Sequence, residues 1–573
     1  VNLKSLIPSS DQNSAQLENL VFKGTFDLGH LTALLQTLDV LPVDTQLAGR
    51  TNIDTRLSIK DNKIELGDSV IDLRDFLFKN KKQKFSEKEI VLTTRGSVDL
   101  KAKAATLKPL ELKTTAGHMA FPELVVTNWS QLKNGVKTSG SIDLDLAPLT
   151  ALLGDVLKLP PETTVAGPAA IKLNIDLTDA QQQFVQLDGA IGPVEVSSND
   201  KPLLSEDTIR LATNLKGDLF DQNFTFSNVE LSTLPISLGA SGKVVPDGEE
   251  RLLTTEGHMA LDLKALSSYL KSFADLDLEM TGSAKRPFAI KAKSTDGQWV
   301  EMPNNTELST SFHADSIRAS GVHIESLEIG VQLADSLAEI DILGTVNRGR
   351  MELQPMIDFK VDPPVFSIPE NSMVLAGVGL TDDTSGDHLA QVHPIFHGSA
   401  ISRGTVDLDT HYFSWPLDKA ARKDATFKVS LVFNDVRLQA GGLLNELLAI
   451  MKANEREITL GDKPMECVGE NDRVQCSPLE ILTRDYSLTM TGSVGFDQSL
   501  DYNVQVPVTR DMVGSDVYKY LEGTFINVPI GGTVSHPSIS HNFVQDAIKD
   551  LIIQAGKKEI TEQAGKLLQK LFQ

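Results

Sequence analysis

Long apolar runs and aromatic side chains are scarce in this sequence. No stretch of roughly 18 apolar residues occurs among its 573 residues, so no segment has the character of a membrane-spanning helix. Aromatic residues make up only 6% of the chain. Hydrophobic residues still reach 41%, which is enough to bury a core and argues against a disordered chain.

Positive charge is also in short supply. The chain carries 54 Lys and Arg residues against 77 Asp and Glu residues, which gives a net charge of −23. Nucleic-acid binders depend on cationic contacts to phosphates, so this balance argues against that class of partner. It also argues against adhesion of the whole surface to an anionic bilayer. Solubility explains the acidic excess.

Only two cysteines occur, Cys467 and Cys476, both in the segment CVGENDRVQC. The turn formers Gly469, Asn471 and Asp472 lie between them, which is typical of a hairpin whose arms a disulfide can join. A zinc site is not expected, because no further ligands flank the pair at matching spacing. A disulfide would indicate an oxidising compartment, the periplasm or the outside of the cell. The alternative is a pair of buried free thiols.

Recognisable catalytic motifs are missing from the sequence. It contains no G-x-S-x-G elbow, no P-loop and no C-x-x-C pair. The best metal-ligand candidates are Asp387, His388, His393 and His397. Pro394 opposes the helix that would bring the last two histidines together, which favours a solvated loop. We therefore expect no enzyme activity, no metal and no cofactor.

The sequence is rich in alternation. In FKVSLVF (427–433) and YNVQVPV (502–508), apolar side chains occupy every second position, as in strands with one apolar face. Many further segments behave in this way, and Asp-Gly, Asn-Asp and Pro-Pro turn signals separate them. The pattern predicts a mainly β chain with few helices. The two best helix candidates are residues 441–454 and the amphipathic C-terminal segment 541–572.

One long unit recurs three times. GTFDLGHLTALL (24–35), GSIDLDLAPLTALL (140–153) and GHMALDLKALSSYL (257–270) begin 116 and 117 residues apart. Each starts with strand-like alternation and continues into leucines at helical spacing, which predicts a strand that runs directly into a short helix. A glycine follows each copy and precedes a new alternating segment; these glycines are Gly49, Gly167 and Gly282.

A fixed long period with interchangeable units is typical of a quasi-linear repeat architecture. We predict one elongated, repetitive antiparallel β-sheet, because no Pro/Gly/Ser-rich linker separates the units. Three separate β domains related by duplication are the alternative. The predicted divisions are β repeats at 1–139, 140–256 and 257–403, a C-terminal β region at 404–540 and an amphipathic C-terminal helix at 541–573.

A sheet of this kind must cover its apolar face. If it folds over along its length, the apolar faces line a hydrophobic groove suited to acyl chains, which gain ~0.8 kcal/mol per buried CH₂. An ordinary closed core is the alternative. The residues predicted by alternation to line the groove are Phe427, Val429, Leu431, Phe433, Leu488, Met490, Val504 and Val506.

The C-terminal helix is predicted to carry an apolar stripe. This stripe would dock on a partner or a membrane, or would close the end of the groove. Packing of the helix on its own sheet is the alternative. The docking residues predicted are Phe543, Ile548, Leu551 and Ile552.

The segment 488–540 combines three features in a fixed order. A G-x-h-x-h strand (h, hydrophobic) starts at Gly492, LDYNVQVPV and a short helix follow, and INVPIGGTVSHPSI ends the segment. The last element matches the pattern h-P-h-x-G-T-h-x-x-P-x-h through Val528, Pro529, Ile530, Gly532, Thr533, Pro537 and Ile539. In this order the features resemble the C-terminal region of the AsmA-like family, the group of AsmA, YhdP and TamB. The recurring GTFDL, GSVDL and GTVDL pentads extend the resemblance loosely over the rest of the chain.

The resemblance implies a non-enzymatic envelope protein with a long folded-over β-sheet, which bridges membranes and conducts phospholipids. Members of the group usually carry an N-terminal transmembrane helix, so an anchor here would come from a segment absent from this chain. We predict a protein of the periplasm or cell envelope of a Gram-negative-type bacterium that binds phospholipid or another acyl lipid. Its expected partners are a membrane or membrane protein at one or both ends, and no nucleic acid. The alternative is a structural or assembly scaffold of the envelope with a closed β core.

Overall fold

The computed structural model describes residues 17–37, 45–80, 84–150, 163–198, 201–274, 278–294, 299, 303–319, 321–380, 389 and 393–571. The chain is mainly β, with 65% strand and 14% helix. Among these residues, 31 strands pair into one large antiparallel sheet, and three short strands form a second sheet. The prediction of a repetitive antiparallel β-sheet with a few short helices is confirmed.

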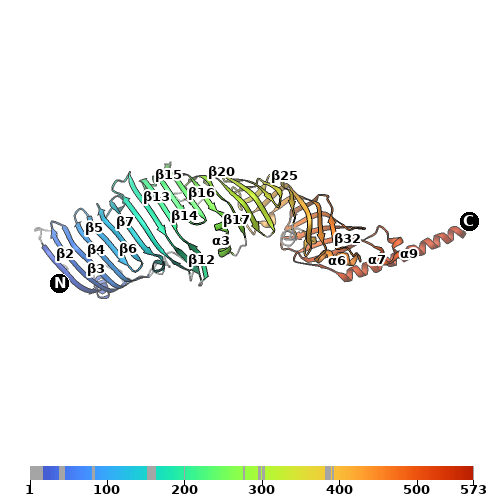
Figure 1. The fold of residues 1–573 in the computed structure, drawn as a ribbon, viewed down its shortest axis with the longest axis horizontal. Helices are drawn as coiled ribbons and strands as arrows, with labels where there is room; N and C mark the ends of the chain where they lie inside the picture. Colours follow the sequence, from blue (N-terminus) through green and yellow to red (C-terminus); the bar gives the residue numbers. More distant parts are fainter. Residues whose placement is uncertain are drawn as a thin grey trace. The chain divides into compact units, whose positions relative to one another are not determined.

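The chain divides into two compact units. Unit 1 comprises residues 1–276 and 285–301, and unit 2 comprises residues 277–284 and 302–573. In unit 1, strands that follow one another in the chain lie side by side in the main sheet (Figure 1). These strands are β1 (Leu17–Asp27), β2 (Gln46–Lys60), β3 (Lys63–Lys79), β4 (Lys84–Asp99), β5 (Ala104–Thr114), β6 (Gly117–Val126), β7 (Val136–Asp145), β9 (Pro168–Asp176), β10 (Gln183–Ile191), β13 (Ile209–Asp218), β14 (Asn223–Ser232), β15 (Ile236–Asp247), β16 (Glu250–Asp262) and β18 (Ser283–Lys293). The second sheet consists of β8 (Thr163–Ala166), β11 (Val194–Ser198) and β12 (Lys201–Glu206).

The residues that begin the predicted repeats lie inside strands. Gly140 falls within β7, Gly257 within β16 and Gly404 within β26 (Ala400–Pro416). A glycine suits position 140 because a Cβ there would lie 2.3 Å from the backbone oxygen of Ala120 in the neighbouring strand. The strands that hold these three glycines all belong to the main sheet. The last predicted boundary, at 540, coincides with the start of helix α9 (His541–Leu571).

Three strands of unit 1 run directly into helices, as the repeats predict. Helix α1 (Leu28–Thr37) follows β1, a helical segment at 146–150 follows β7, and α3 (Leu263–Ala274), which is labelled in Figure 1, follows β16. An aspartate ends each strand and caps the helix, because its carboxylate accepts a hydrogen bond from a backbone N–H of the first turn. The capping distances are 2.8 Å for Asp27, 3.1 Å for Asp145 and 2.9 Å for Asp262.

The three predicted glycines share one backbone conformation. Gly49, Gly167 and Gly282 have φ angles of +131°, +136° and +130°, a region that L side chains rarely adopt. At Gly167 the chain passes from β8 to β9, and a Cβ there would lie 2.1 Å from the backbone oxygen of Pro193. In the first repeat, β2 runs through Gly49 without a break. The second repeat thus divides a strand that the first repeat keeps whole.

The strands of unit 1 bend along a line of β-bulges. A bulge places an extra residue in one strand of a pair, which bends that strand locally. The register shifts lie side by side in neighbouring strands, and we call them together the bulge line. They occur between Asp54 and Leu57 in β2, Leu66 and Ser69 in β3, Thr94 and Gly96 in β4, and Ala120 and Glu123 in β6.

Hydroxyl groups satisfy backbone oxygens along the bulge line. A bulge disrupts the ladder and leaves backbone groups unpaired. The hydroxyl of Ser69 donates to the oxygen of Gly67 at 3.0 Å, and the hydroxyl of Thr138 donates to the oxygen of Glu123 at 2.8 Å. Ser69, Thr94 and Thr138 keep only 5%, 8% and 8% of their surface exposed. These three nearly buried side chains therefore lie along the line at which the register shifts.

Unit 2 continues the antiparallel pairing and adds helices. Its strands are β17 (Glu279–Thr281), β19 (Thr306–Ala319), β20 (Val322–Ala334), β21 (Leu337–Val346), β22 (Gly349–Leu353), β23 (Met356–Asp358), β24 (Val365–Ile368), β25 (Ser372–Gly379), β26 (Ala400–Pro416), β27 (Thr426–Gln439), β28 (Glu457–Leu460), β29 (Met465–Glu470), β30 (Arg473–Leu482), β31 (Ser487–Gly495), β32 (Leu500–Pro507), β33 (Phe525–Thr533) and β34 (His536–Ile539). Its helices are η4 (Pro394–Phe396), η5 (Arg422–Asp424), α6 (Gly442–Ile450), α7 (Arg510–Val513), α8 (Ser515–Leu521) and α9. Helix α6 lies within the range predicted at 441–454.

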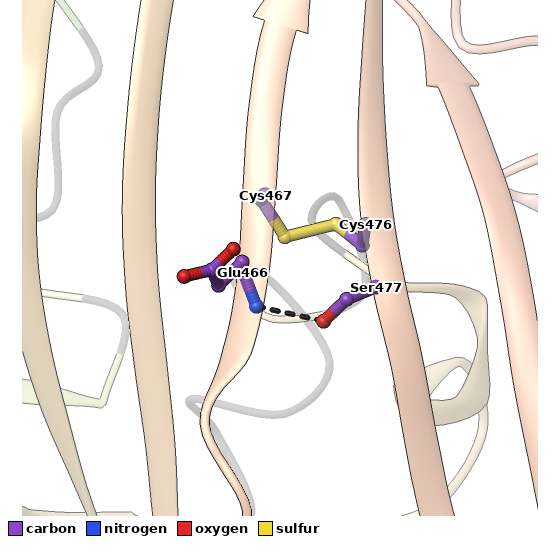
Figure 2. The surroundings of a disulfide bond; sticks show 4 residues. All are labelled: Glu466, Cys467, Cys476 and Ser477. Carbon is purple, nitrogen blue, oxygen red and sulfur yellow. Dashed lines mark hydrogen bonds between the residues drawn. A yellow bond between two sulfur atoms is a disulfide. The ribbon is translucent and has the colours of Figure 1, made fainter.

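A disulfide joins the hairpin of β29 and β30 (Figure 2). Cys467 and Cys476 lie directly opposite each other, with their Cα atoms 4.1 Å apart, and keep 1% and 2% of their surface exposed. Asn471 and Asp472 connect the two strands with φ angles of +51° and +61°. Positive φ at both residues is typical of the two-residue type I′ turn, which matches the twist of a hairpin. The pair is therefore a disulfide and not two free thiols.

Candidate functional site

A continuous row of apolar side chains crosses unit 1 from strand to strand. Residues directly opposite each other in an antiparallel pair lie on the same face of the sheet. The register connects one residue of each of twelve strands, from β2 to β16, in a single line that we call the apolar row. Its members are Ile53, Ile71, Leu92, Leu112, Met119, Ile142, Ile171, Gly189, Leu211, Leu231, Leu238 and Met259.

A second row runs on the other side of the bulge line and on the same face. It is mostly apolar and crosses eleven strands, from β2 to β15. Its members are Leu57, Leu66, Gly96, Leu107, Leu124, Thr138, Ile175, Val185, Leu215, Phe226 and Gly242. The two rows and the bulge line between them make one continuous, mostly apolar band on this face of the sheet, which we call the apolar trough.

The apolar row remains open to solvent. Leu211 and Leu231 keep 42% and 36% of their surface exposed, and every other apolar member of the row is half-buried. Side chains of a packed β core usually lose nearly all contact with water. A large apolar surface that stays accessible on a folded protein marks a site of interaction.

The opposite face of the same strands is charged. The guanidinium of Arg74 lies 2.6 Å from Asp72 and 2.7 Å from Glu89, and Lys137 lies 2.8 Å from Asp176. The hydrogen bond from Lys137 lowers the pKa of the Asp176 carboxyl and raises the pKa of the lysine, so both groups stay charged. Unit 1 therefore presents an amphipathic sheet, with ion pairs on one face and the apolar trough on the other.

The eight residues predicted to line a groove lie in unit 2 and are packed. Leu488, Met490, Val504 and Val506 have no exposed surface, and Phe433 keeps 1%. Phe427 and Leu431 are buried, and Val429 is half-buried against the core. Four leucines of α6 with at most 2% exposure join the same cluster: Leu443, Leu444, Leu447 and Leu448. Seven of the eight residues thus lie in or against this core, and Phe427 is buried beside Phe413, so the structure shows packed side chains at these positions.

The four residues of helix α9 that are predicted to dock on a partner fall into a packed pair and an exposed pair. Ile548 and Leu551 pack partly buried against the core of unit 2, next to Val544, which keeps 5% of its surface exposed. Phe543 and Ile552 instead keep 47% and 39% of their surface exposed. Only half of the predicted docking residues are thus accessible, because the first turns of the helix rest on their own sheet.

The metal-ligand candidates do not converge in the part of the chain that is described. Asp387 and His388 lie outside the described residues. His393 is fully buried, and its Nδ1 accepts the N–H of Ile395 at 3.4 Å. Burial lowers the pKa of His393 to about 3, so the ring is neutral near pH 7. No group of three or more His, Cys, Asp or Glu side chains suited to a metal occurs among the described residues.

The alternation of apolar and polar residues does not predict that two glutamates are buried. Glu87 and Glu206 keep 5% and 3% of their surface exposed. Glu87 accepts the hydroxyl of Thr115 at 2.6 Å, and Glu206 accepts the backbone N–H of Leu234 at 3.0 Å. Each carboxylate thus ties down a turn 28 residues farther along the chain. The shared motif S-E-x-x-I, at 86–90 and 205–209, is the signal that could have revealed them.

No family model, curated protein or solved structure matches this chain. The described residues contain no helix that is both long enough and apolar enough to cross a bilayer. In the segment 488–540, the order of elements is β31, β32, α7, α8, β33 and β34. This is the order of strands and short helix on which the resemblance to the AsmA-like family depends, and membership of that family stays a prediction.

Proposed function

We propose that this protein is a non-enzymatic lipid-binding protein that holds acyl chains on the apolar trough of unit 1. One observation carries the proposal: the apolar row crosses twelve strands, with an apolar side chain in eleven of them, and remains accessible along its length. A globular core would have buried these side chains. Acyl chains are the ligand class that fits a long surface without fixed polar contacts.

The size of the surface supports useful affinity. An acyl chain that lies along the trough and buries about half the surface of ten methylene groups gains about 4 kcal/mol. Two chains of one phospholipid gain about 8 kcal/mol, which corresponds to a Kd of about 1 μM before the entropic cost of binding. The hydroxyls of Ser69 and Thr138 already donate to backbone oxygens, so these two positions offer a bound chain no unpaired hydroxyl donor.

Transfer of lipid between membranes in the cell envelope is the role we propose for this binding. The resemblance of 488–540 to the AsmA-like family supports it, as does the length of the apolar row. The buried disulfide between Cys467 and Cys476 is consistent with an oxidising compartment such as the periplasm. A structural scaffold of the envelope is the second candidate, and the closed core of unit 2 is the observation that favours it.

Lipid analysis of the purified chain tests the proposal. Native mass spectrometry and solvent extraction should both find co-purifying phospholipid. In Leu92→Glu a charge enters the apolar row, so the lipid content should fall severalfold. Val91→Glu is the matched control, because Val91 lies next to Leu92 on the charged face, opposite Lys113. A wild-type chain free of lipid, or equal losses in the two variants, would contradict the proposal.

A further inference from the structure

The antiparallel order places two kinds of connection at opposite ends of the strands in unit 1. The helices follow β1, β7 and β16 at one end. The turns after β4, β6 and β13 lie at the other end, because these strands run in the opposite direction. We call these three turns the loop edge; it comprises residues 100–103, 127–135 and 219–222.

Large apolar side chains gather on the loop edge. Leu100, Trp129, Leu132 and Phe220 keep 48%, 38%, 52% and 44% of their surface exposed. Single exposed apolar residues are ordinary, but four on neighbouring loops at one end of a sheet form a surface that needs a partner. Trp129 is one of the three tryptophans in the chain. Tryptophan is enriched where proteins meet the interface of a bilayer.

Hydrogen bonds hold these loops against one another. The N–H of Trp129 donates to the backbone oxygen of Lys103 at 2.9 Å. The fully buried amide of Gln183 donates to the oxygen of Lys133 at 2.8 Å and accepts the N–H of Leu219 at 2.9 Å. The loops after β4, β6 and β13 are therefore connected through defined contacts. Their apolar side chains form one built surface.

The loop edge is close to electrically neutral. Lys101, Lys103 and Lys133 stand against Asp99, Asp218 and Asp221, and the turn after β9 (177–182), which lies between these loops, adds Asp179, so the excess is one negative charge. The ammonium of Lys133 lies 5.3 Å from the ring centroid of Phe220, within reach of a cation–π contact. Attraction of this edge to a partner must therefore come mainly from apolar burial and not from net charge.

The loop edge is continuous with the apolar trough. Leu100 follows Val98 by two residues, and Val98 lies opposite Ile64 on the trough face of β4 and β3. Two residues of a strand span roughly 7 Å, so an apolar path leads from the loop edge to the trough in a single step. An acyl chain at this edge would not have to cross the charged face.

We propose that the loop edge of unit 1 inserts into the surface of a phospholipid bilayer and lets acyl chains pass laterally between the bilayer and the trough. This inference rests on the proposed function and adds the place at which lipid enters. Trp129, Leu132 and Phe220 supply the apolar insertion. The lysines remain near the headgroups, because a long side chain can keep its charge in water while its stem is buried.

Binding of the full chain to vesicles of phosphatidylethanolamine and phosphatidylglycerol tests the inference. Sedimentation should show binding that persists at high salt, and tryptophan emission should shift to shorter wavelengths. The double variant Trp129→Ser/Leu132→Ser should lower the partition coefficient at least about tenfold, since two exposed apolar side chains are lost. Leu234→Ser is the matched control, because Leu234 is 62% exposed but lies at the helix end of the strands; its binding should equal that of the wild type.

Lipid content measured on the same samples separates the two proposals. A chain that carries lipid but does not bind vesicles would contradict the proposal that the loop edge inserts into a bilayer, and would not contradict the proposed lipid binding. A chain without lipid would overturn the proposed function itself. Equal losses of vesicle binding in the double variant and in Leu234→Ser would contradict insertion through the loop edge. Binding that disappears at high salt would also contradict it, because such binding would be electrostatic.

Discussion

Truncation of one leucine in each unit distinguishes an open apolar face from a closed core. Leu488 in β31 has no exposed surface, whereas Leu92 in the apolar row is half-buried. Leu488→Ala removes buried methyl groups and leaves a cavity, so we expect a loss of about 3–4 kcal/mol in the unfolding free energy of unit 2. Leu92→Ala leaves no enclosed cavity, and we expect about 1 kcal/mol for unit 1.

Tryptophan fluorescence can follow the two units separately during urea unfolding. Trp415 belongs to unit 2, where its ring centroid lies 5.4 Å from that of Phe496, whereas Trp129 and Trp299 belong to unit 1. A Trp129→Phe/Trp299→Phe background leaves Trp415 as the reporter, and Trp415→Phe leaves the other two. With a slope of about 3 kcal/mol per molar urea, Leu488→Ala should lower the midpoint by about 1 M and Leu92→Ala by about 0.3 M.

Equal shifts in the two units would refute this reasoning. If Leu92→Ala cost as much as Leu488→Ala, the apolar row would have to be covered in solution, and no trough would be open to a ligand. If Leu488→Ala lowered the unfolding free energy as little as Leu92→Ala does, the core of unit 2 would be open to solvent, as the groove predicted there from alternation requires. The comparison is internal, so it does not depend on absolute stability.

Three further perturbations have expected outcomes. Between about pH 6.5 and pH 3, His393 is protonated in the unfolded chain but stays neutral in the folded one. The unfolding free energy of unit 2 should therefore decrease by about 1.4 kcal/mol for each unit by which the pH is lowered, and in His393→Leu the urea midpoint should depend less on pH. Replacing Cys467 and Cys476 by alanine should cost about 2–3 kcal/mol, as expected for a short closed loop, and reductant should lower the wild-type urea midpoint to that of the variant. Gly167→Ala should lower the thermal midpoint of unit 1 by several degrees, whereas Gly239→Ala, with open space at its Cβ, should change it little.

The sequence predicts the elements of this fold well because they depend on local signals. Alternation predicts strands with one apolar face. The recurrence of a strand, a short helix and a glycine predicts the repeat. The capping role of Asp27, Asp145 and Asp262 follows from their position at the start of each helix. The predicted repeat boundaries fall on glycines that lie inside strands, because a glycine can mark a close approach of two strands as well as a turn.

Alternation does not predict whether an apolar face is open. Leu488 and Met490 in β31 follow the same pattern as Leu92 in β4, yet the first two are fully buried and the third is not. The difference comes from helix α6, which adds its leucines to the core of unit 2 through contacts distant in sequence. The apolar row cannot be predicted from alternation either, because it depends on the register between strands. A shift of one residue in a strand would move that strand's member of the row to the other face.

Photo-crosslinking along β4 tests the central claim most directly. A photoreactive amino acid is placed at each position from 90 to 94, and the purified chain is irradiated in the presence of phospholipid. We expect lipid adducts at 90, 92 and 94, which lie on the trough face, and none at 91 and 93, which lie on the charged face. Equal labelling of both sets of positions, or no labelling at any of them, would contradict the claim that this face of unit 1 binds acyl chains.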